Sequence, residues 1–105
     1  EMQEEITGTL EIREVFKVTK VGNVAGCYVT SGKVERANPI RVIRDGVVLA
    51  DTTISTLKRF KDDVKDVSYG YECGLQINGF GDIQQGDIIE SYKVKEVKRK
   101  LGVKD

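Results

Sequence analysis

The residues best suited to chemistry in this sequence lie in one stretch, Leu57–Gly74. Within it three cations surround one aromatic ring: Lys58, Arg59, Lys61 and Phe60. Such a cluster can bind RNA, because cations contact phosphates while the ring offers a face to a base. The stretch also fits a short amphipathic helix with a solvated charged face. Its apolar residues have the spacing of such a helix: Leu57, Phe60, Val64 and Val67.

The composition limits the kind of functional site to which this cluster can belong. The 105-residue chain has 17 basic and 17 acidic residues, so any RNA contact must come from a local patch. Histidine is absent, which removes the commonest general base and excludes histidine triads. No phosphate-binding P-loop sequence is present. We therefore expect a binding domain, not an enzyme, with no cofactor.

The two cysteines, Cys27 and Cys73, do not make a zinc site without histidine or further cysteines. Nothing indicates secretion, and no apolar run is long enough to span a membrane, so we expect a cytoplasmic protein with reduced thiols. Cys27 shares its parity with apolar neighbours, which predicts a buried side chain. Burial is less favoured for Cys73, because Glu72 and Gly74 beside it suggest a strand edge with accessible backbone.

The elements that would position these residues are short β-strands. Alternating apolar and polar residues predict strands near 9–19, 24–31, 40–44, 47–50, 52–60, 72–78 and 88–97. Asp45-Gly46 between apolar runs predicts a two-residue hairpin. In the first strand one apolar face comprises Leu10, Ile12, Phe16 and Val18. Its interruption at Glu14 predicts a bulge near Glu14-Val15.

These strands predict an all-β fold, a small closed or nearly closed antiparallel barrel. We expect residues 1–8 to be a linker remnant, residues 9–97 the barrel, and residues 98–105 a basic C-terminal tail. In this arrangement the run 58–60 ends a strand and leads into a loop or single helical turn.

Several short segments of the sequence, taken in order, resemble the motifs of one protein family. They are Glu14-Val-Phe-Lys-Val, Val24-Ala-Gly-Cys27, Arg44-Asp-Gly46, Leu57-Lys-Arg-Phe-Lys-Asp-Asp-Val64, Gly70-Tyr-Glu-Cys-Gly74 and Gly86-Asp87. The ordered set looks like the C-terminal domain of bacterial translation initiation factor two, from Leu10 to Val97. This resemblance implies a six-stranded antiparallel Greek-key β-barrel like domain II of translational GTPases.

The resemblance also implies a partner, the formylmethionyl acceptor (3′ CCA) end of initiator tRNA. Carried onto this sequence, the family's binding residues are Cys27, Lys58, Arg59, Phe60, Lys61, Glu72, Cys73 and Gly74. We expect the three cations to hold acceptor-strand phosphates and the segment 72–74 to read the formylmethionyl group. Phe60 stands where some relatives have tyrosine, so it can stack on the terminal adenine but lacks a hydroxyl. The chain is expected to be monomeric and, without the family's GTPase domain, neither to bind nor to hydrolyse GTP.

A second function stays open. The barrel can instead be a protein-interaction module that docks ribosomal protein or other domains of a translational GTPase. That alternative predicts that Lys58, Arg59 and Lys61 are dispensable for RNA binding. In the full-length factor, the ribosome is an expected partner under both functions.

Overall fold

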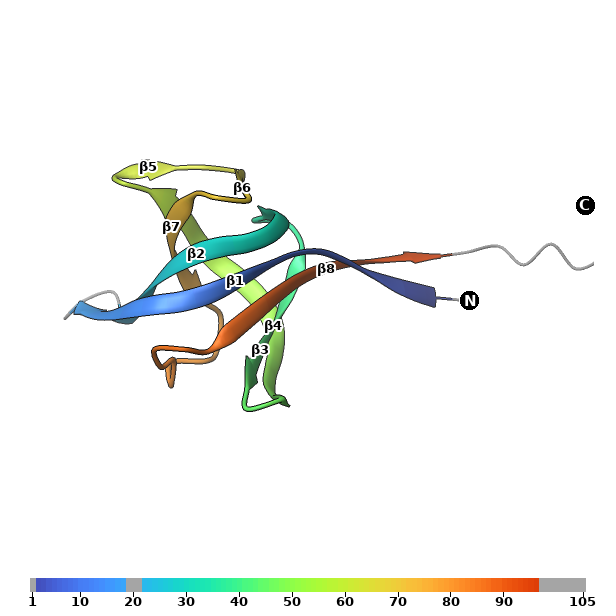
Figure 1. Cartoon of the computed structure of the whole chain (residues 1–105), viewed down its shortest axis with the longest axis horizontal. Helices are drawn as coiled ribbons and strands as arrows, with labels where there is room; N and C mark the ends of the chain where they lie inside the picture. The colour runs from blue at the N-terminus through green and yellow to red at the C-terminus, as the bar shows by residue number, and fades with distance from the viewer. Residues whose placement is uncertain (1, 19–21, 97–105) are drawn as a thin grey trace, which may run out of the picture.

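The computed structural model describes residues 2–18 and 22–96, and all regular structure within them is β-strand. The strands are β1 (Met2–Val18), β2 (Gly22–Glu35), β3 (Pro39–Arg44), β4 (Val47–Arg59), β5 (Asp62–Asp63), β6 (Asp66–Ser68), β7 (Glu72–Ile77) and β8 (Ile88–Glu96). Six of them form an antiparallel ring in the order β1-β8-β3-β4-β7-β2. The ring is closed because β1 pairs with both β2 and β8 (Figure 1). The predicted all-β, six-stranded barrel is confirmed, and no helix that could cross a membrane occurs in the described ranges.

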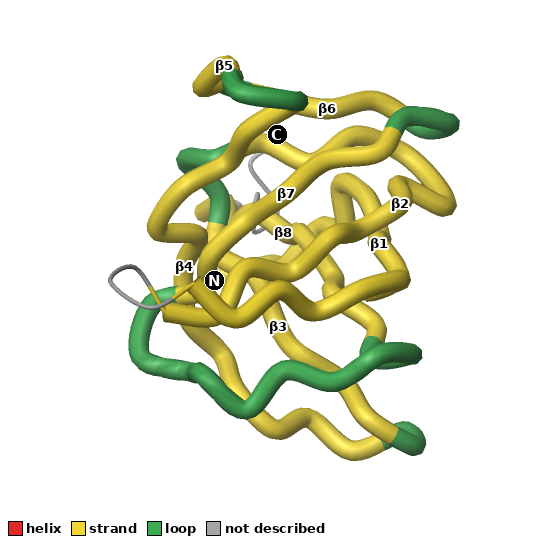
Figure 2. Tube along the Cα trace, turned by 90° about the vertical axis from the view of Figure 1, so that its left-hand side faces the viewer, coloured by secondary structure: helices red, strands yellow, loops and turns green. Residues whose placement is uncertain are grey.

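The connectivity of the ring is that of a Greek key. β3, β4 and β7 are successive neighbours, and the chain then returns so that β8 lies beside β3. The two shortest strands lie outside the ring, β5 paired with β4 and β6 paired with β2. Both lie at the same end of the barrel (Figure 2).

The core fills the inside of the ring with small and branched apolar side chains. One face of each strand in the ring turns inward, which is the expected alternation for a closed barrel. The buried apolar residues are Leu10, Ile12, Ala25, Cys27, Val29, Val34, Ile40, Val42, Ile54, Leu57, Val67, Cys73, Leu75, Ile77, Ile83 and Ile89.

The first strand differs from the prediction on either side of a bulge. The pairing of β1 with β2 shifts register between Ile12 and Glu14, so Arg13 is an extra residue. One extra residue turns the following side chains to the other face of the sheet. Val15 therefore packs against the core, whereas Phe16 is 48% exposed. A bulge was expected here, but the prediction that Phe16 shares the face of Ile12 is wrong.

The strand also begins earlier than expected. Pairing of β1 with β8 starts at Met2 and Glu96, so residues 2–8, predicted as a linker remnant, belong to the strand. The polar sequence conceals this because side chains on both faces are exposed at residues 3–6, where β1 and β8 leave the barrel as a two-stranded ribbon (Figure 1). The predicted basic tail, 98–105, lies outside the described residues.

The helical alternative for the stretch 57–67 is wrong. β4 continues to Arg59, the chain turns at Phe60-Lys61, and β5 pairs back with Asp62 opposite Arg59. The hairpin predicted at Asp45-Gly46 is confirmed, with φ of 52° and 78° at its two residues.

One buried ion pair fixes the loop between β7 and β8. Asp87, 2% exposed, accepts hydrogen bonds from Arg44 Nε and Nη2, each at 2.8 Å, and from the Gln84 backbone N–H at 3.0 Å. The hydrogen bonds from Arg44 are the main cause that lowers the pKa of this carboxyl. The pair therefore ties the loop 78–87 to β3.

Candidate nucleic-acid interface

The floor of the candidate site is made by two glycines on neighbouring strands. Gly74 of β7 is the register partner of Gly26 of β2. Lys58 of β4 continues this row beyond Gly74, and Glu14 of β1 continues it beyond Gly26. Because the two central positions carry no side chain, the barrel surface is hollowed between its outer members. The Phe16 ring lies close to Gly26, whereas at Gly74 a ligand can approach the backbone closely.

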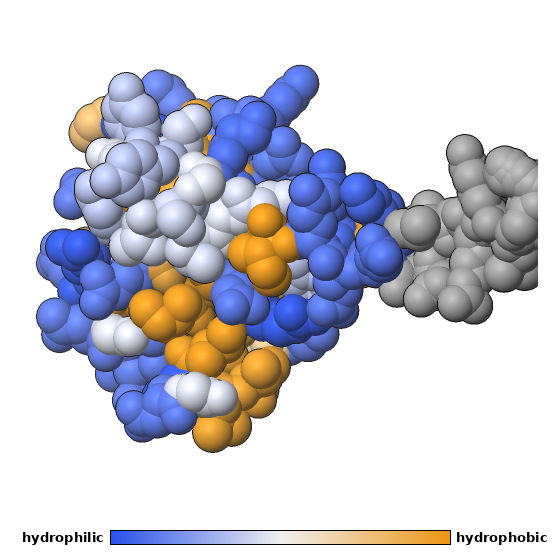
Figure 3. Space-filling view, turned by 45° about the vertical axis from the view of Figure 1, so that its right-hand side comes forward, coloured by the Kyte–Doolittle hydropathy of each residue, from blue (hydrophilic) through white to orange (hydrophobic). Residues whose placement is uncertain are grey.

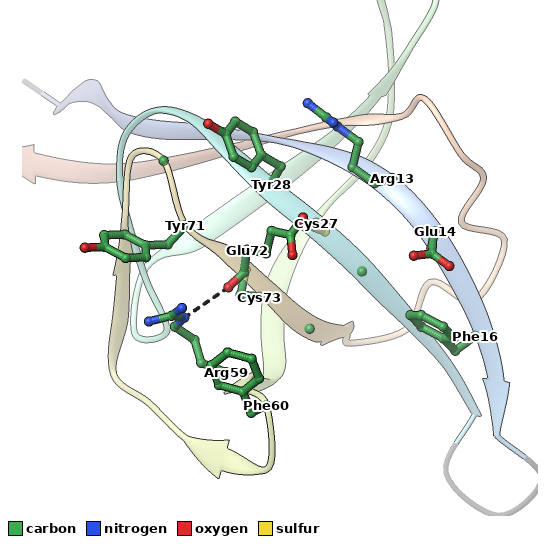
Figure 4. Close-up of a pocket in the computed structure, with 13 residues that line it drawn as sticks. Arg13, Glu14, Phe16, Cys27, Tyr28, Arg59, Phe60, Tyr71, Glu72 and Cys73 are labelled. Atoms are coloured by element: carbon green, nitrogen blue, oxygen red, sulfur yellow. Dashed lines mark hydrogen bonds between the residues drawn. The ribbon is translucent and has the colours of Figure 1, made fainter.

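A groove of about 500 Å³ lies over this floor. Its lining comes from β1, β2, β4, β7 and the turns beside them: Arg13, Glu14, Phe16, Gly26, Cys27, Tyr28, Arg59, Phe60, Gly70, Tyr71, Glu72, Cys73 and Gly74. In Figure 4, Arg13 and Tyr28 lie on one side and Arg59 and Phe60 on the other, with Glu72 between them. The volume is in the range of small-molecule sites, roughly 300–1,000 Å³.

Most of the residues singled out from the sequence meet in this groove. Those brought together are Cys27, Arg59, Phe60, Glu72, Cys73 and Gly74. Lys58 lines a separate, smaller hollow next to it, and Lys61 is exposed in the β4–β5 turn and lines neither. Successive residues of a strand point to opposite sides, and Lys58 and Arg59 accordingly line different hollows.

Arg59 is fixed at the mouth of the groove. Its Nε donates a hydrogen bond to the backbone oxygen of Glu72 at 3.2 Å, drawn as a dashed line in Figure 4. Its guanidinium carbon lies 4.7 Å from the ring centre of Tyr71 and 5.3 Å from that of Phe60. Contacts of this kind hold a cation over aromatic faces. Arg59 thus presents its remaining N–H donors from a fixed position.

Phe60 is an exposed aromatic residue in an unusual backbone conformation. Its φ is 59°, in the left-handed region that non-glycine residues seldom adopt, and its side chain is 91% exposed. The tight β4–β5 hairpin imposes this φ, since Lys58 and Arg59 already pair with Asp63 and Asp62. An apolar ring held outward on a strained turn is typical of a contact surface.

The two cysteines do not offer their thiols to the groove. Cys27 and Cys73 are register partners, and their side chains are 2% and 6% exposed. Burial raises the pKa of the Cys73 thiol to about 11 and that of Cys27 well above its usual value. Cys27 faces the core as predicted. Cys73 is buried as well; its register partner is Cys27 of β2, and the pairing of β7 with β4 begins one residue later, at Gly74 with Lys58.

Seven lining residues were not among the predicted site residues: Glu14, Gly26, Gly70 and four with aromatic or cationic side chains, Arg13, Phe16, Tyr28 and Tyr71. The bulge in β1 turns Phe16 outward, and its ring lies over Gly26, where an added Cβ would be 3.0 Å from Phe16 Cε2. Tyr28 is the register partner of Glu72, and the guanidinium of Arg13 lies 4.9 Å from its ring centre. The sequence did carry a signal for two of these residues, because Tyr28 directly follows Cys27 and Tyr71 directly precedes Glu72.

The site is thus an exposed groove with two arginines on aromatic rings, a glycine floor and no thiol available for reaction. The fold and the groove define a six-stranded antiparallel β-barrel domain with a binding groove on its surface. Residues 22–90 match the family described as Elongation factor Tu domain 2, and the chain belongs to this family.

Similar proteins show more closely which kind of factor this domain is related to. The chain is 57% identical to a protein of Chlorobium phaeobacteroides, and 58% identical to one of Flavobacterium johnsoniae, each over 96% of the chain and 11% of the relative. It is 56% identical to one of Bacillus cereus over 94% of the chain and 14% of the relative. Each of the three is a protein named Translation initiation factor IF-2. The chain therefore spans about a tenth of the length of these relatives and is homologous to part of a translation initiation factor.

Proposed function

We propose that this chain is the C-terminal domain of a bacterial translation initiation factor two and binds the formylmethionyl acceptor end of initiator tRNA in the cytoplasm. The observation that supports this most is the convergence on one groove of three segments far apart in sequence, represented by Cys27, Arg59-Phe60 and Glu72–Gly74. Sequence similarity to an initiation factor does not by itself require these three segments to form a groove, whereas binding of a small ligand does.

The groove suits the chemistry of an aminoacyl ester joined to adenosine. That ligand is small and largely neutral, and it needs hydrogen bonds and an apolar slot more than a broad positive surface. In our proposal the exposed ring of Phe60 stacks on the terminal adenine. The backbone of the segment 72–74, next to the glycine floor, contacts the ester and the methionyl group.

Arg59 gives a reason for preferring the formylated form. Its guanidinium is fixed on Tyr71 and Phe60, so its free N–H groups can donate to a formyl oxygen. An unformylated methionyl group carries an ammonium, which the same guanidinium repels. Hydrogen bonds to charged groups contribute about 1.5–3 kcal/mol, which corresponds to at least about tenfold in affinity.

The test is a titration of the domain with formylated and unformylated initiator tRNA. We expect the formylated tRNA to bind at least about tenfold more tightly, and Arg59→Ala to remove most of this difference. Lys93→Ala is the matched control, because it removes one charge from the exposed part of β8 and lines none of the hollows described. Equal binding of the two tRNAs by the wild-type domain would contradict the proposal.

A second candidate, docking of ribosomal protein or another domain of the factor, is favoured by one surface feature. Val48, Ile43 and Ile88 are register neighbours across β4, β3 and β8. With Val47 and Leu49 of the β3–β4 hairpin they form an apolar patch toward the lower part of Figure 3. Val48→Glu should weaken such docking and leave tRNA binding intact. If Lys58, Arg59 and Lys61 proved dispensable for tRNA binding, docking would be the better account.

A further inference from the structure

The first part of β4 has one edge without a neighbouring strand in the described ranges. Over residues 47–53 its register partners all belong to β3, and pairing with β7 on the opposite edge begins only at Ile54. The last neighbour on that edge is Asn78, whose backbone N–H donates to the Thr53 oxygen at 3.0 Å. Residues 47–51 therefore form a free strand edge, on a hairpin that projects from the barrel (Figure 1). Such an edge offers backbone N–H and C=O groups to a further strand.

The side chains along this free edge are apolar and exposed. Val47, Val48 and Leu49 are 58%, 52% and 40% exposed. Leu49 is the extra residue of a bulge in the pairing with β3, which leaves its side chain outside, next to Val48. Edge strands are commonly protected by charge, proline or a bulge. Here the bulge is present, but residues 47–50 carry neither charge nor proline, so the edge presents an apolar surface that a partner can cover.

Carboxylates surround the free edge and make this region negative. Two arginines lie beside it, Arg41 and Arg44, and both are engaged in ion pairs. Their carboxylate partners are Glu4, Asp51 and Glu90 for Arg41, and Asp82 and Asp87 for Arg44. With Asp45 in the hairpin turn, six carboxylates are therefore grouped around two guanidinium groups. This excess of four negative charges lies on a chain whose net charge is zero, with Asp45 at one end of the edge and Asp51 at the other.

The negative charge decides which partner fits the edge. It would repel RNA phosphates, so the edge does not extend the tRNA groove. It would also repel a second copy of the domain, because docking edge to edge would bring two negative regions together. A protein segment that carries cations fits, since extended segments add to free sheet edges through backbone hydrogen bonds and side-chain contacts. The positions of Asp45 and Asp51 require those cations at both ends of an apolar run.

We propose that the free edge of β4 binds an extended segment of a basic ribosomal protein, in which a short apolar run is bordered at both ends by lysine or arginine. The segment pairs with the backbone of residues 47–51, its apolar side chains lie on Val48 and Leu49, and its cations contact the carboxylates. Proteins that bind RNA carry such cations in clusters, which makes the ribosome a source of this chemistry. The inference deepens the docking candidate described above. It does not depend on tRNA binding, because residues 47–51 line neither the groove nor the hollow beside it.

The probes are two short peptides, a run of valines bordered at both ends by lysines and the same run bordered by glutamates. In an NMR titration we expect the lysine peptide to shift the amide signals of residues 47–51 and to bind at least about tenfold more tightly than the glutamate peptide. Nuclear Overhauser contacts between the peptide backbone and the backbone of residues 47–51 should show an added strand.

Two variants separate the apolar contact from the charge. Val48→Thr should weaken binding of the lysine peptide about fivefold, whereas the same change at the exposed Val94 of β8 is the matched control and should not. Asp45→Asn preserves the turn, because Asn-Gly also forms a two-residue hairpin. Together with Asp82→Asn it should weaken binding about threefold to tenfold and reduce its salt dependence. Asp66→Asn, on β6, is the control for charge.

Four outcomes would overturn the proposal. They are equal binding of the two peptides, amide shifts that lie outside the β3–β4 hairpin, contacts to side chains without backbone contacts, and unchanged binding by Val48→Thr. Concentration-dependent shifts of residues 47–51 without any peptide would favour a second copy of the domain instead. Because the titration contains no RNA, its result is separate from the tRNA proposal. Val48→Thr should bind formylmethionyl-tRNA as the wild-type domain does, and a loss of that binding would show that the edge acts through the tRNA site.

Discussion

Gly74→Ala should make the domain more stable while weakening ligand binding. Gly74 lies in the middle of β7 with no φ in the left-handed region, and an added Cβ would meet only Val24 Cγ1, at the ordinary contact distance of 3.7 Å. A glycine inside a strand costs about 0.5–1 kcal/mol relative to alanine. For a domain of this size that gain corresponds to a rise in melting temperature of roughly 2–8 °C.

The new methyl group would stand on the floor shared by the groove and the smaller hollow beside it. Inserting a methyl group into a fitted contact typically costs about 1–3 kcal/mol, so affinity for formylmethionyl-adenosine should fall by about fivefold to more than a hundredfold. Calorimetry measures the affinity, and a thermal melt followed by circular dichroism measures the stability. Stability and binding should thus change in opposite directions, which a general loss of structure cannot produce.

Two other glycines serve as comparisons. Gly81→Ala meets no atom within 4 Å and lies outside both hollows, so it should leave binding unchanged. Gly26→Ala would place its Cβ 3.0 Å from Phe16 Cε2 and should force that ring to move. If Gly74→Ala raised the melting temperature but left affinity intact, no ligand would approach the floor, and the reasoning about the groove would be refuted.

Three further predictions concern charge and pH. Lys58→Ala and Lys61→Ala should each flatten the salt dependence of tRNA binding by about one unit of slope or less; fluorescence titrations at several salt concentrations measure this, and unchanged slopes would argue against phosphate contacts. Alkylation of Cys73 in the folded domain should accelerate about tenfold per pH unit up to its pKa of about 11, since only the thiolate reacts; mass spectrometry follows the rate, and a plateau near pH 9 would contradict control by burial. The lowered pKa of Asp87 stabilises the fold above the ordinary pKa of a carboxyl, and this stability is lost as the pH falls. Arg44→Met should therefore move acid unfolding, followed by circular dichroism, to higher pH; an unchanged midpoint would show that the pair contributes nothing.

The strands were predictable from the sequence because alternation and turn residues are local signals. Asp45-Gly46 has the backbone angles that its sequence requires, and the buried side of Cys27 followed from parity alone. Local signals fail where the conformation of one strand depends on its pairing with another strand. The bulge at Arg13 turned Phe16 outward, and the polar start of β1 became a strand only through its pairing with β8.

The composition of the groove was harder to predict for the same reason. The resemblance to a known family identified three of the segments that line the groove. Tyr28 also lines it, because Tyr28 lies opposite Glu72 on a neighbouring strand. The interaction that fixes Arg59 involves Tyr71, twelve positions later in the chain and brought near by the return of β7 along β4. Spacing along the chain does not encode such registers, so the smaller hollow became visible only in three dimensions.

Closure of the ring by its first and last strands affects how the domain can be made. β8 pairs on one side with β1 and on the other with β3, so both of these strands have an unpaired edge until β8 is in place. Pairing of distant segments is intrinsically slow, and open strand edges promote association between chains. A chain emerging from the ribosome therefore has no closed barrel, and two strand edges open to other chains, until its last strand has been synthesised.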